Sequence, residues 1–439
     1  MKRYNWLLVS LSAVIYHVAT LGFLSLPLMF FSFVLLACCS HNSRTSLRYQ
    51  VLWGIVFFVC HFACLFPALN ILPGTFQINI AILGLIVACT VFYLACWFWL
   101  VNRMFVWAGS SERVRLAGLF VMGWAMWWWL SSRYLFALFH PSMGYPFVNP
   151  LITFIDLPSM LGVISWSGEL VLLFALMTIC WCCSRVLRDQ SLMALLVGTF
   201  ALLLFLVGPC VRLSVDKTTF VPDLHCTGVV CVPDLPLHDA VESLCRLLDQ
   251  IAVDNPACRL VVAPESTIKA PINLYSSCID KIAMHLEGRV LLLGAHKSVA
   301  GNLYNCMYLM NRSGIIWSGS KSVLLPAFEK SVYGLFLSKN RLCAARGAKT
   351  CCPIAQYRYV PLICSEFLLE IAKINLDDAD GIVTIINDSW FAKTAYVGWF
   401  RQYARYRSIR DDIPVLYCSH TTTAMFMPLG NKLLFTTLC

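Results

Sequence analysis

Long apolar runs separated by short loops fill the first 211 residues of the chain. After Lys2 and Arg3, apolar residues extend from Trp6 to about Cys39, with a break near residues 22–27. Further runs cover residues 51–69, 78–101, 116–139, 161–183 and 192–211. A helix needs about 20 apolar residues to cross the hydrocarbon core, so the first stretch suits two short spans better than one. We therefore predict seven transmembrane helices in residues 1–211, with the first pair retained rather than cleaved as a signal peptide.

Basic residues occur in alternate loops of this region. The first, third and fifth loops contain neither Lys nor Arg, whereas the second, fourth and sixth contain Arg44 and Arg48, then Arg103, Arg113 and Arg115, then Arg185 and Arg188. Positively charged loops remain in the cytoplasm. This alternation predicts a cytoplasmic N-terminus and places everything after about Arg212 on the outer side. In a bacterial cell the protein would lie in the inner membrane, with its second half in the periplasm.

The composition supports a membrane protein rather than a nucleic-acid-binding one. Hydrophobic residues make up 59 % of the 439 residues and charged residues only 13 %, against about a quarter charged in soluble proteins. The net charge of +10 is spread over loops and forms no basic stripe, so we predict no nucleic-acid partner. Cys226 with Cys231, or Cys351 with Cys352, are disulfide or metal candidates, but no His or Cys stands at zinc spacing. No cofactor is predicted.

One charged residue lies within the predicted spans beside an aromatic run. Arg133 follows Trp127-Trp128-Trp129 late in the fifth span, and Glu169 lies near the start of the sixth. Two interpretations of Arg133 stay open: its side chain extends to the outer interface within an aromatic belt, or it faces the phosphate of a lipid drawn up between the helices.

From about Phe220 the pattern changes to strands alternating with helices. We predict strands at residues 227–232, 259–263, 290–295, 304–310, 315–318, 381–386 and 415–419, and helices at 239–253, 276–286, 367–371 and 398–410. Residues 311–314 predict a hairpin turn. Such alternation is typical of a layered α/β domain. The chain is thus divided into a membrane domain, residues 1–211, and an α/β domain, residues 212–439.

Three predicted strands of the α/β domain adjoin reactive side chains. Glu265 follows one strand, Lys321 precedes an apolar run that predicts a second, and Cys364 ends a third. Taken singly, such a cysteine is usually a small core residue, such a glutamate can cap a helix, and a lysine usually lies on the surface. Together they supply what thiol catalysis needs: a nucleophile, a carboxylate that takes its proton and an ammonium group.

The same segments carry motifs in a specific order, namely Pro264-Glu265, Lys321 followed by Leu324-Leu325-Pro326 and Glu329, Ile363-Cys364-Ser365-Glu366, and Asn387-Asp388-Ser389-Trp390-Phe391. This order resembles the nitrilase (carbon-nitrogen hydrolase) superfamily, and within it the membrane-bound apolipoprotein N-acyltransferases, over Val229 to Gly430. The resemblance implies a four-layer α-β-β-α sandwich after the multi-span helical membrane domain, with Glu265, Lys321 and Cys364 as catalytic residues.

The resemblance also implies a mechanism and supporting residues. Attack by the Cys364 thiolate would form a thioester while Glu265 moves the proton, and Lys321 and the backbone N–H of Ser365 would stabilise the oxyanion. The resemblance further assigns Glu329 to orienting Lys321 or the acceptor amine, and Glu366 to supporting the nucleophile. Asn305 and Asn387-Asp388 would shape the pocket, although a turn or packing role explains them equally well.

The sequence departs from the resembled acyltransferases at three places. Ser365 stands where they carry an aromatic residue, Ala263 stands where they carry tryptophan, and the chain ends at Cys439, where they continue to a final span. A divergent conjugal-transfer (TraB-type) branch with the same layout is therefore a second candidate.

Three functions follow. The first is transfer of a fatty acyl group from phospholipid to an amine on a lipoprotein or similar acceptor. The second is a related amidase or acyltransferase that is accessory to conjugal transfer or envelope remodelling. The third is a non-catalytic membrane assembly protein with the same fold. The intact set of Glu265, Lys321 and Cys364 argues against the third.

Overall fold

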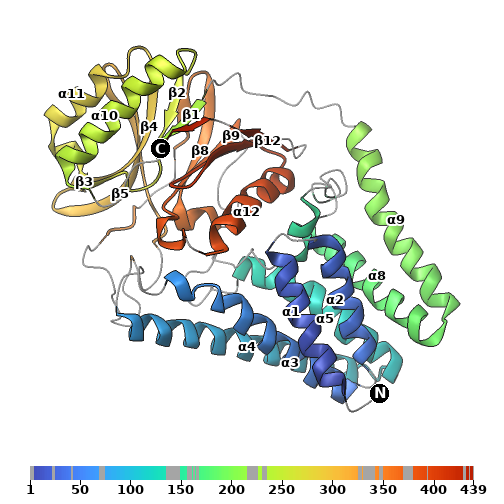
Figure 1. Ribbon diagram of the computed structural model, residues 1–439. Coiled ribbons are helices and arrows are strands. Elements are labelled where there is room, and N and C mark those ends of the chain that lie inside the picture. Colours follow the sequence, from blue (N-terminus) through green and yellow to red (C-terminus); the bar gives the residue numbers. More distant parts are fainter. Residues whose placement is uncertain are drawn as a thin grey trace.

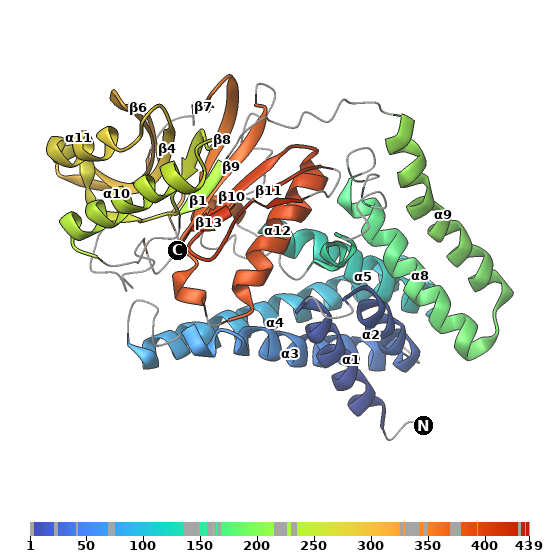
Figure 2. The same cartoon turned by 45° about the horizontal axis from the view of Figure 1, so that its top comes forward.

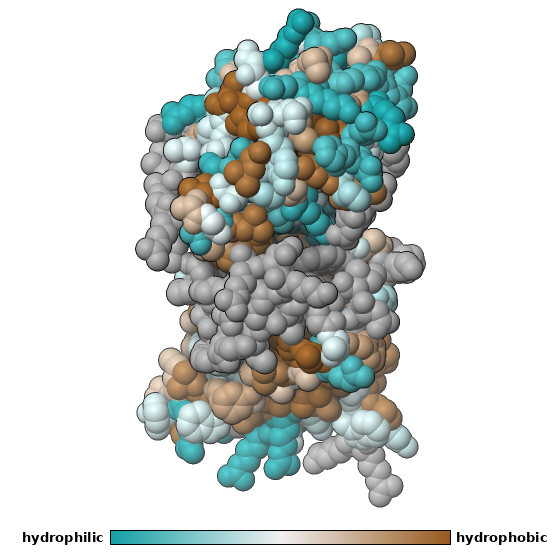
Figure 3. Space-filling view, turned by 90° about the vertical axis from the view of Figure 1, so that its left-hand side faces the viewer, coloured by the Kyte–Doolittle hydropathy of each residue, from teal (hydrophilic) through white to brown (hydrophobic). Residues whose placement is uncertain are grey.

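The computed structural model describes residues 4–21, 25–40, 43–68, 75–134, 149–155, 161, 164, 168–214, 226–229, 235–324, 329, 342–345, 350–368, 379–392, 394–428, 432–434 and 436–438. These residues form a helical half followed by an α/β half (Figure 1). In the space-filling view of Figure 3, hydrophobic residues predominate over the helical half and hydrophilic residues over the α/β half. The two halves therefore suit different surroundings, as the sequence predicts.

The described residues of the helical half form seven α-helices, at the places where the sequence predicts spans. They are α1 (Asn5–Thr20), α2 (Ser25–Cys39), α3 (Ser43–Ala63), α4 (Phe76–Trp107), α5 (Glu112–Tyr134), α8 (Glu169–Asp189) and α9 (Leu192–Ser214). By length and apolar composition, three helical segments are able to cross a membrane: 44–68, 76–107 and 169–189. The helical membrane region is thus supported, while the count of seven crossings stays a prediction.

Aromatic rings and a few hydroxyl groups hold the helical half together. Trp53 packs edge-on against Trp124, with ring centroids 4.7 Å apart, and both are fully buried. Where α1 crosses α2, the hydroxyl groups of Ser12 and Ser32 each donate to the other residue's carbonyl oxygen, at 2.7 and 2.8 Å. Small residues and reciprocal hydrogen bonds of this kind let apolar helices approach closely.

The α/β half contains two sheets. Its strands are β1 (Cys226–Val229), β2 (Leu260–Val262), β3 (Ile268–Pro271), β4 (Val290–Val299), β5 (Asn302–Asn311), β6 (Gly314–Ser320), β7 (Cys352–Ile354), β8 (Tyr357–Ile363), β9 (Gly381–Ile386), β10 (Val415–Ser419), β11 (Thr423–Phe426), β12 (Lys432–Leu434) and β13 (Thr436–Leu438). The first sheet has the order β13-β1-β2-β4-β5-β6, with β3 beside β4, and the second has the order β12-β11-β10-β9-β8-β7. The predicted hairpin joins β5 to β6.

The two sheets pack face to face and carry helices on their outer faces. Helices α10 (Leu237–Asp254) and α11 (Ser276–Met284) cover the first sheet, and α12 (Tyr396–Asp411) covers the second (Figures 1 and 2). Helix α10 buries residues at three- and four-residue spacing, as an amphipathic helix does. Between the sheets lies a separate apolar core that includes Val262, Met307 and Ile385. The predicted four-layer α-β-β-α sandwich is confirmed.

Helix α12 also joins the sandwich to the helical half. The Trp399 ring stacks on His61 of α3 at a centroid distance of 4.2 Å, and its Nε1 donates to the carbonyl oxygen of Thr20. Farther along α12, the Tyr406 hydroxyl donates to Glu169 at the start of α8. One continuous buried core therefore runs from the membrane helices through α12 to the second sheet.

Glu169 is the centre of a polar cluster at this junction. Its Oε1 accepts a hydrogen bond from Asn149 Nδ2 at 2.9 Å, and its Oε2 lies 2.7 Å from Arg133 NH1. The Arg133 guanidinium also lies over the Trp129 ring, 4.9 Å from its centroid. Arg133 is thus held by Glu169 and the Trp129 ring. Both interpretations of Arg133, the outer interface and the lipid phosphate, stay predictions.

One strand prediction is wrong. The apolar run after Lys321 forms no strand over its described residues, 322–324, and Lys321 instead follows the end of β6. The backbone N–H groups of Ser322 and Val323 donate to the Glu366 side chain, which takes the place of a neighbouring strand. The predicted helix at residues 367–371 is a short 3-10 helix, Cys364–Leu368, over its described part. Leu325-Pro326 and Cys231 lie outside the described residues.

Candidate active site

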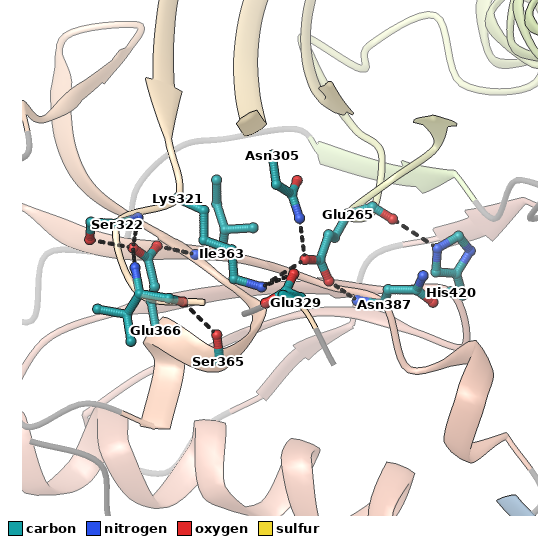
Figure 4. Close-up of polar contacts among 11 residues, drawn as sticks. Glu265, Asn305, Lys321, Ser322, Glu329, Ile363, Ser365, Glu366, Asn387 and His420 are labelled. Carbon is teal, nitrogen blue, oxygen red and sulfur yellow. Dashed lines mark hydrogen bonds and ion pairs between the residues drawn. The ribbon is translucent and has the colours of Figure 1, made fainter. Parts of the chain in front are cut away.

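The candidate site forms where strands of the two facing sheets end. Glu265 follows β2 and Lys321 follows β6, both from the first sheet, while Cys364 follows β8 of the second sheet. Because the sheets are stacked, their strand ends meet at the edge of the shared core. The structure therefore brings together side chains that are about 100 positions apart in the sequence. Figure 4 shows the polar contacts of Glu265, Lys321 and Glu366.

Glu265 is buried and fully engaged in hydrogen bonds. Its Oε1 accepts from Asn305 Nδ2 at 2.7 Å and from Lys321 Nζ at 3.2 Å, and its Oε2 accepts from the backbone N–H of Asn387 at 2.9 Å (Figure 4). Burial raises the pKa of Glu265, but the charge of Lys321 and the N–H of Asn387 outweigh it and hold that pKa below its ordinary value. Glu265 is therefore a carboxylate at neutral pH, able to accept a proton.

The backbone near Glu265 is tightly packed. A Cβ atom on Gly294 of β4 would lie 2.2 Å from the carbonyl oxygen of Pro264, so only glycine fits there. His420 contributes a further contact from the second sheet, because its Nε2 lies 3.0 Å from the Glu265 carbonyl oxygen. The segment that carries Glu265 is thus fixed from both sheets. Sequence reasoning missed His420, which follows β10 with no motif around it.

Lys321 lies between two carboxylates. Its Nζ is 2.8 Å from Glu329 Oε1 as well as 3.2 Å from Glu265 Oε1, and its side chain is 1 % exposed. Burial lowers the pKa of Lys321, but the charges of Glu265 and Glu329 raise it well above its ordinary value. The ammonium is therefore permanently charged in this position. The predicted role of Glu329, orienting Lys321, agrees with this contact.

Cys364 occupies a strained turn from strand to helix. It follows the last residue of β8, begins the 3-10 helix Cys364–Leu368 and has a φ of +50°. A non-glycine residue with positive φ costs about 1–3 kcal/mol and is often found at functional sites. Cys364 is partly exposed, whereas Ser365 and Glu366, the next two residues of the same short helix, are buried. This turn places Cys364 at the end of β8, at the edge of the sheet.

The pKa of the Cys364 thiol is raised well above its ordinary value. Burial is the main cause, the negative charge of Glu265 adds to it, and Lys321 opposes both. The resting site therefore holds a neutral thiol beside an ionised carboxylate. Such a pair transfers the thiol proton to the carboxylate only as the sulfur attacks, which is general base catalysis.

Glu366 accepts hydrogen bonds from two segments of the candidate site. Its Oε1 accepts from Ser322 N and Ser322 Oγ, both at 2.6 Å, and from Val323 N at 3.3 Å, while its Oε2 accepts from Ile363 N at 2.9 Å. The carboxylate connects the segment after Lys321 to Ile363, the residue before Cys364. The predicted supporting role of Glu366 thus has a physical form: it fixes Lys321 and Cys364 relative to each other.

Ser365 strengthens the same connection, since its Oγ donates to the Val323 carbonyl oxygen at 2.8 Å. Its backbone N–H lies in the first turn of a helix, where N–H groups lack intrahelical partners. No group of three or more His, Cys, Asp or Glu suited to a metal ion occurs among the residues that the structure describes. Cys351 and Cys352 are free thiols.

Comparison with known proteins gives partial matches. A protein named apolipoprotein N-acyltransferase from Allorhizobium ampelinum is 28 % identical over 185 residues, which are 37 % of this chain and 34 % of that protein. One of the same name from Rhizobium rhizogenes is 23 % identical over 197 residues, 40 % of this chain and 36 % of that protein. The chain is similar to apolipoprotein N-acyltransferases. The resemblance inferred from the motifs is thereby confirmed, although the match spans about a third of each relative's length. No family model matches the chain.

Solved structures with a likeness to this chain include a carbon-nitrogen hydrolase and a protein of the CN-hydrolase superfamily. The enzyme from Helicobacter pylori is 12 % identical, with a TM-score of 0.37, and the match covers 48 % of this chain and 84 % of that one. A superfamily protein from Xanthomonas campestris is 16 % identical, with a TM-score of 0.38, and the match covers 49 % of this chain and 86 % of that one.

Proposed function

We propose that the protein is a membrane-bound acyltransferase that moves a fatty acyl group from a phospholipid to an amine, through a thioester on Cys364. The observation that carries the proposal is the buried cluster of Glu265, Lys321 and Glu329 at the strand ends beside the strained turn of Cys364. The apolar helices packed against this domain favour a lipid donor. The names of the two curated relatives support an amine on a lipoprotein as acceptor.

The first half-reaction forms the thioester. Sγ of Cys364 attacks the ester carbonyl carbon while Glu265 takes the thiol proton, and the carbonyl oxygen becomes an oxyanion. The Lys321 ammonium and the Ser365 backbone N–H stabilise this charge, an effect worth about 3–4 kcal/mol per donor. The carbon–oxygen bond then breaks, Glu265 returns the proton to the leaving alkoxide, and lysophospholipid departs.

The second half-reaction transfers the acyl group. The amine nitrogen attacks the thioester carbonyl carbon, Glu265 takes a proton from the nitrogen, and the carbon–sulfur bond breaks. The proton passes to the departing sulfur, so the products are an amide and the original thiol. Water in place of the amine would give a fatty acid and make the protein a hydrolase.

The proposed location is the bacterial inner membrane, with the N-terminus in the cytoplasm and the catalytic domain in the periplasm. The alternation of arginines between loops supports this orientation. Reporter fusions after Arg48, Arg115 and Arg188 test it. All three should report a cytoplasmic position, and a periplasmic signal at any of them would break the topology.

Ser365 favours a second candidate, a divergent amidase or acyltransferase that is accessory to conjugal transfer or envelope remodelling. Its hydroxyl is turned inward to Val323, so no aromatic ring stands at this position beside the nucleophile. A wider acceptor site would result.

The acceptor distinguishes the candidates. The protein carrying the acyl group is mixed with a lipidated peptide that has a free N-terminal amine. The same peptide with an acetylated N-terminus is the control, and the masses of the products are measured by mass spectrometry. The acyltransferase proposal expects an acyl increment on the free peptide only. Release of fatty acid at the same rate with either peptide would favour a hydrolase. If neither fatty acid nor acylated peptide formed, the result would favour the non-catalytic candidate.

A further inference from the structure

A groove distinct from the candidate active site lies between helices α4, α5, α8 and α9. Its volume is about 610 Å³, and its walls are mostly apolar, with Phe105, Trp181 and Val197 among them. Two guanidinium groups, those of Arg113 and Arg185, also line it. A groove of this size is within the range of specific small-molecule sites, about 300–1,000 Å³.

The groove lies at the end of α8 that is farther from the α/β half. Glu169 begins α8 and contacts Tyr406 of the catalytic half. Arg185 follows 16 positions later on the same helix, which corresponds to about 24 Å along the axis. Figure 1 shows the end of α8 where it meets α9 pointing away from the sheets. The lining of the groove includes no residue of the candidate active site, so the groove is a separate feature.

Positive charge exceeds negative charge at the mouth of the groove. Among the described residues, the first turn of α5 and the last two turns of α8 carry four arginines and two carboxylates, namely Arg113, Arg115, Arg185, Arg188, Glu112 and Asp189. Glu112 pairs with Arg115, and Asp189 is shared by Arg185 and Arg188. The mouth therefore favours an anion.

Helix α9 leaves apolar side chains uncovered beside the groove. Leu195, Leu196 and Phe200 are 52–67 % exposed. Apolar surface next to a basic mouth, between membrane helices, matches the two parts of a phospholipid: acyl chains and a charged head group. Basic pockets between transmembrane helices on the cytoplasmic side bind anionic head groups in this way.

We infer that this groove binds an anionic phospholipid from the leaflet opposite the catalytic domain. Its phosphate is bound by Arg113 and Arg185, since a guanidinium group can make two parallel N–H···O bonds to phosphate oxygens. An acyl chain follows the apolar walls. The bound lipid fills the space between α5 and α9 and so holds α9, the helix that leads to the catalytic half. The inference does not depend on the chemistry of Cys364.

The test is native mass spectrometry of the full-length protein in detergent, titrated with cardiolipin or phosphatidylcholine. The wild type should retain one cardiolipin and release phosphatidylcholine. The double variant Arg113→Ala/Arg185→Ala should bind cardiolipin about thirtyfold more weakly. Arg113→Lys/Arg185→Lys should keep most of the affinity. Arg103→Ala is the matched control, because Arg103 is exposed, lies over Trp99 and does not line the groove.

Equal binding of the two lipids by the wild type, or unchanged cardiolipin affinity in the double alanine variant, would overturn the inference. Ala194→Trp provides an independent check, because the larger side chain fills the apolar part of the groove while Arg113 and Arg185 are kept. It should abolish retention of cardiolipin. Retained binding in that variant would place the lipid elsewhere. Far-UV circular dichroism confirms that each variant keeps its helices.

Discussion

The hydroxyl of Tyr406 on α12 donates a hydrogen bond to the carboxylate of Glu169, the first residue of α8. The neighbouring residue on α12, Arg407, donates to the carbonyl oxygen of Phe367. Phe367 belongs to the short helix that begins at Cys364. Helix α12 therefore connects Glu169 of the helical half to the short helix that begins at Cys364.

Tyr406→Phe should slow the acylation of Cys364 when the donor is phospholipid in a bilayer. The rate of acylation by a soluble short-chain ester should stay the same. The variant loses one buried hydrogen bond to a charged group, worth about 1.5–3 kcal/mol, and we expect about a tenfold lower rate with the bilayer donor. The exposed Tyr275→Phe is the control. Equal losses with both donors would show that Tyr406 only stabilises the fold, and no loss would contradict the coupling.

Lys321→Ala should lower the rate of thioester formation by about two to three orders of magnitude, because the oxyanion loses its charged donor. It also leaves Glu265 and Glu329 buried without their cation, so the free energy of unfolding should fall by about 3–5 kcal/mol. Stopped-flow acylation and denaturant unfolding measure the two effects. A rate within threefold of the wild type would exclude Lys321 from the chemistry.

Glu265→Gln should separate two properties of Cys364. Acyl transfer should be lost, because an amide cannot accept the thiol proton. Alkylation of Cys364 by iodoacetamide at pH 8 should become faster, because the Glu265 charge raises the pKa of the thiol and the variant lacks it. In the wild type, alkylation should keep rising with pH into the alkaline range. Slower alkylation in the variant would contradict this electrostatic account.

The pH dependence of stability follows from the lowered pKa of Glu265. A carboxylate whose pKa is lower in the folded state contributes stability that is present above the unfolded pKa, about 4.3 for glutamate. That contribution is lost as the pH falls through the lower folded pKa. Between pH 5 and pH 3, the wild type should therefore lose more stability than Glu265→Gln. Thermal unfolding at each pH measures these losses. An equal loss of stability in the wild type and in Glu265→Gln would contradict the link between the Glu265 pKa and stability.

Glu366→Gln should disturb the site without removing a reacting group. The amide has only one acceptor oxygen, whereas both carboxylate oxygens accept backbone N–H groups. We expect a loss of about 1–3 kcal/mol in the free energy of unfolding and slower acylation. Glu287→Gln, on an exposed side chain, is the control. Acylation lost with unfolding unchanged would instead assign Glu366 to the chemistry.

The sequence predicts the layered α/β fold because its elements have local causes. The spacing of apolar residues in α10 and the fully buried run of β9 are visible in the sequence. The hairpin at Asn311 to Gly314 also has a local cause, since Gly314 has a φ of +101° and Asn311 Oδ1 accepts the Ser313 N–H. Such local patterns are enough to place strands and helices in order.

Features that depend on distant contacts could not be predicted in this way. Strand β13 is three residues long and exists by pairing with β1, about 200 positions earlier. The apolar run after Lys321 resembles a strand, but the side chain of Glu366 accepts its N–H groups. The motifs predicted Glu265, Lys321 and Cys364 as a set, whereas the contact of His420 with Glu265 requires the packing of two sheets.

The central claim is that Cys364 carries the acyl group, and intact-protein mass spectrometry tests it most directly. The purified protein is incubated with phospholipid and quenched in acid, beside Cys364→Ala and, as a control, Cys343→Ala, which alters another partly exposed thiol. The account predicts a fatty-acyl increment in the wild type and Cys343→Ala that hydroxylamine removes, and none in Cys364→Ala. An equal increment in Cys364→Ala, or none in any form, would contradict the account.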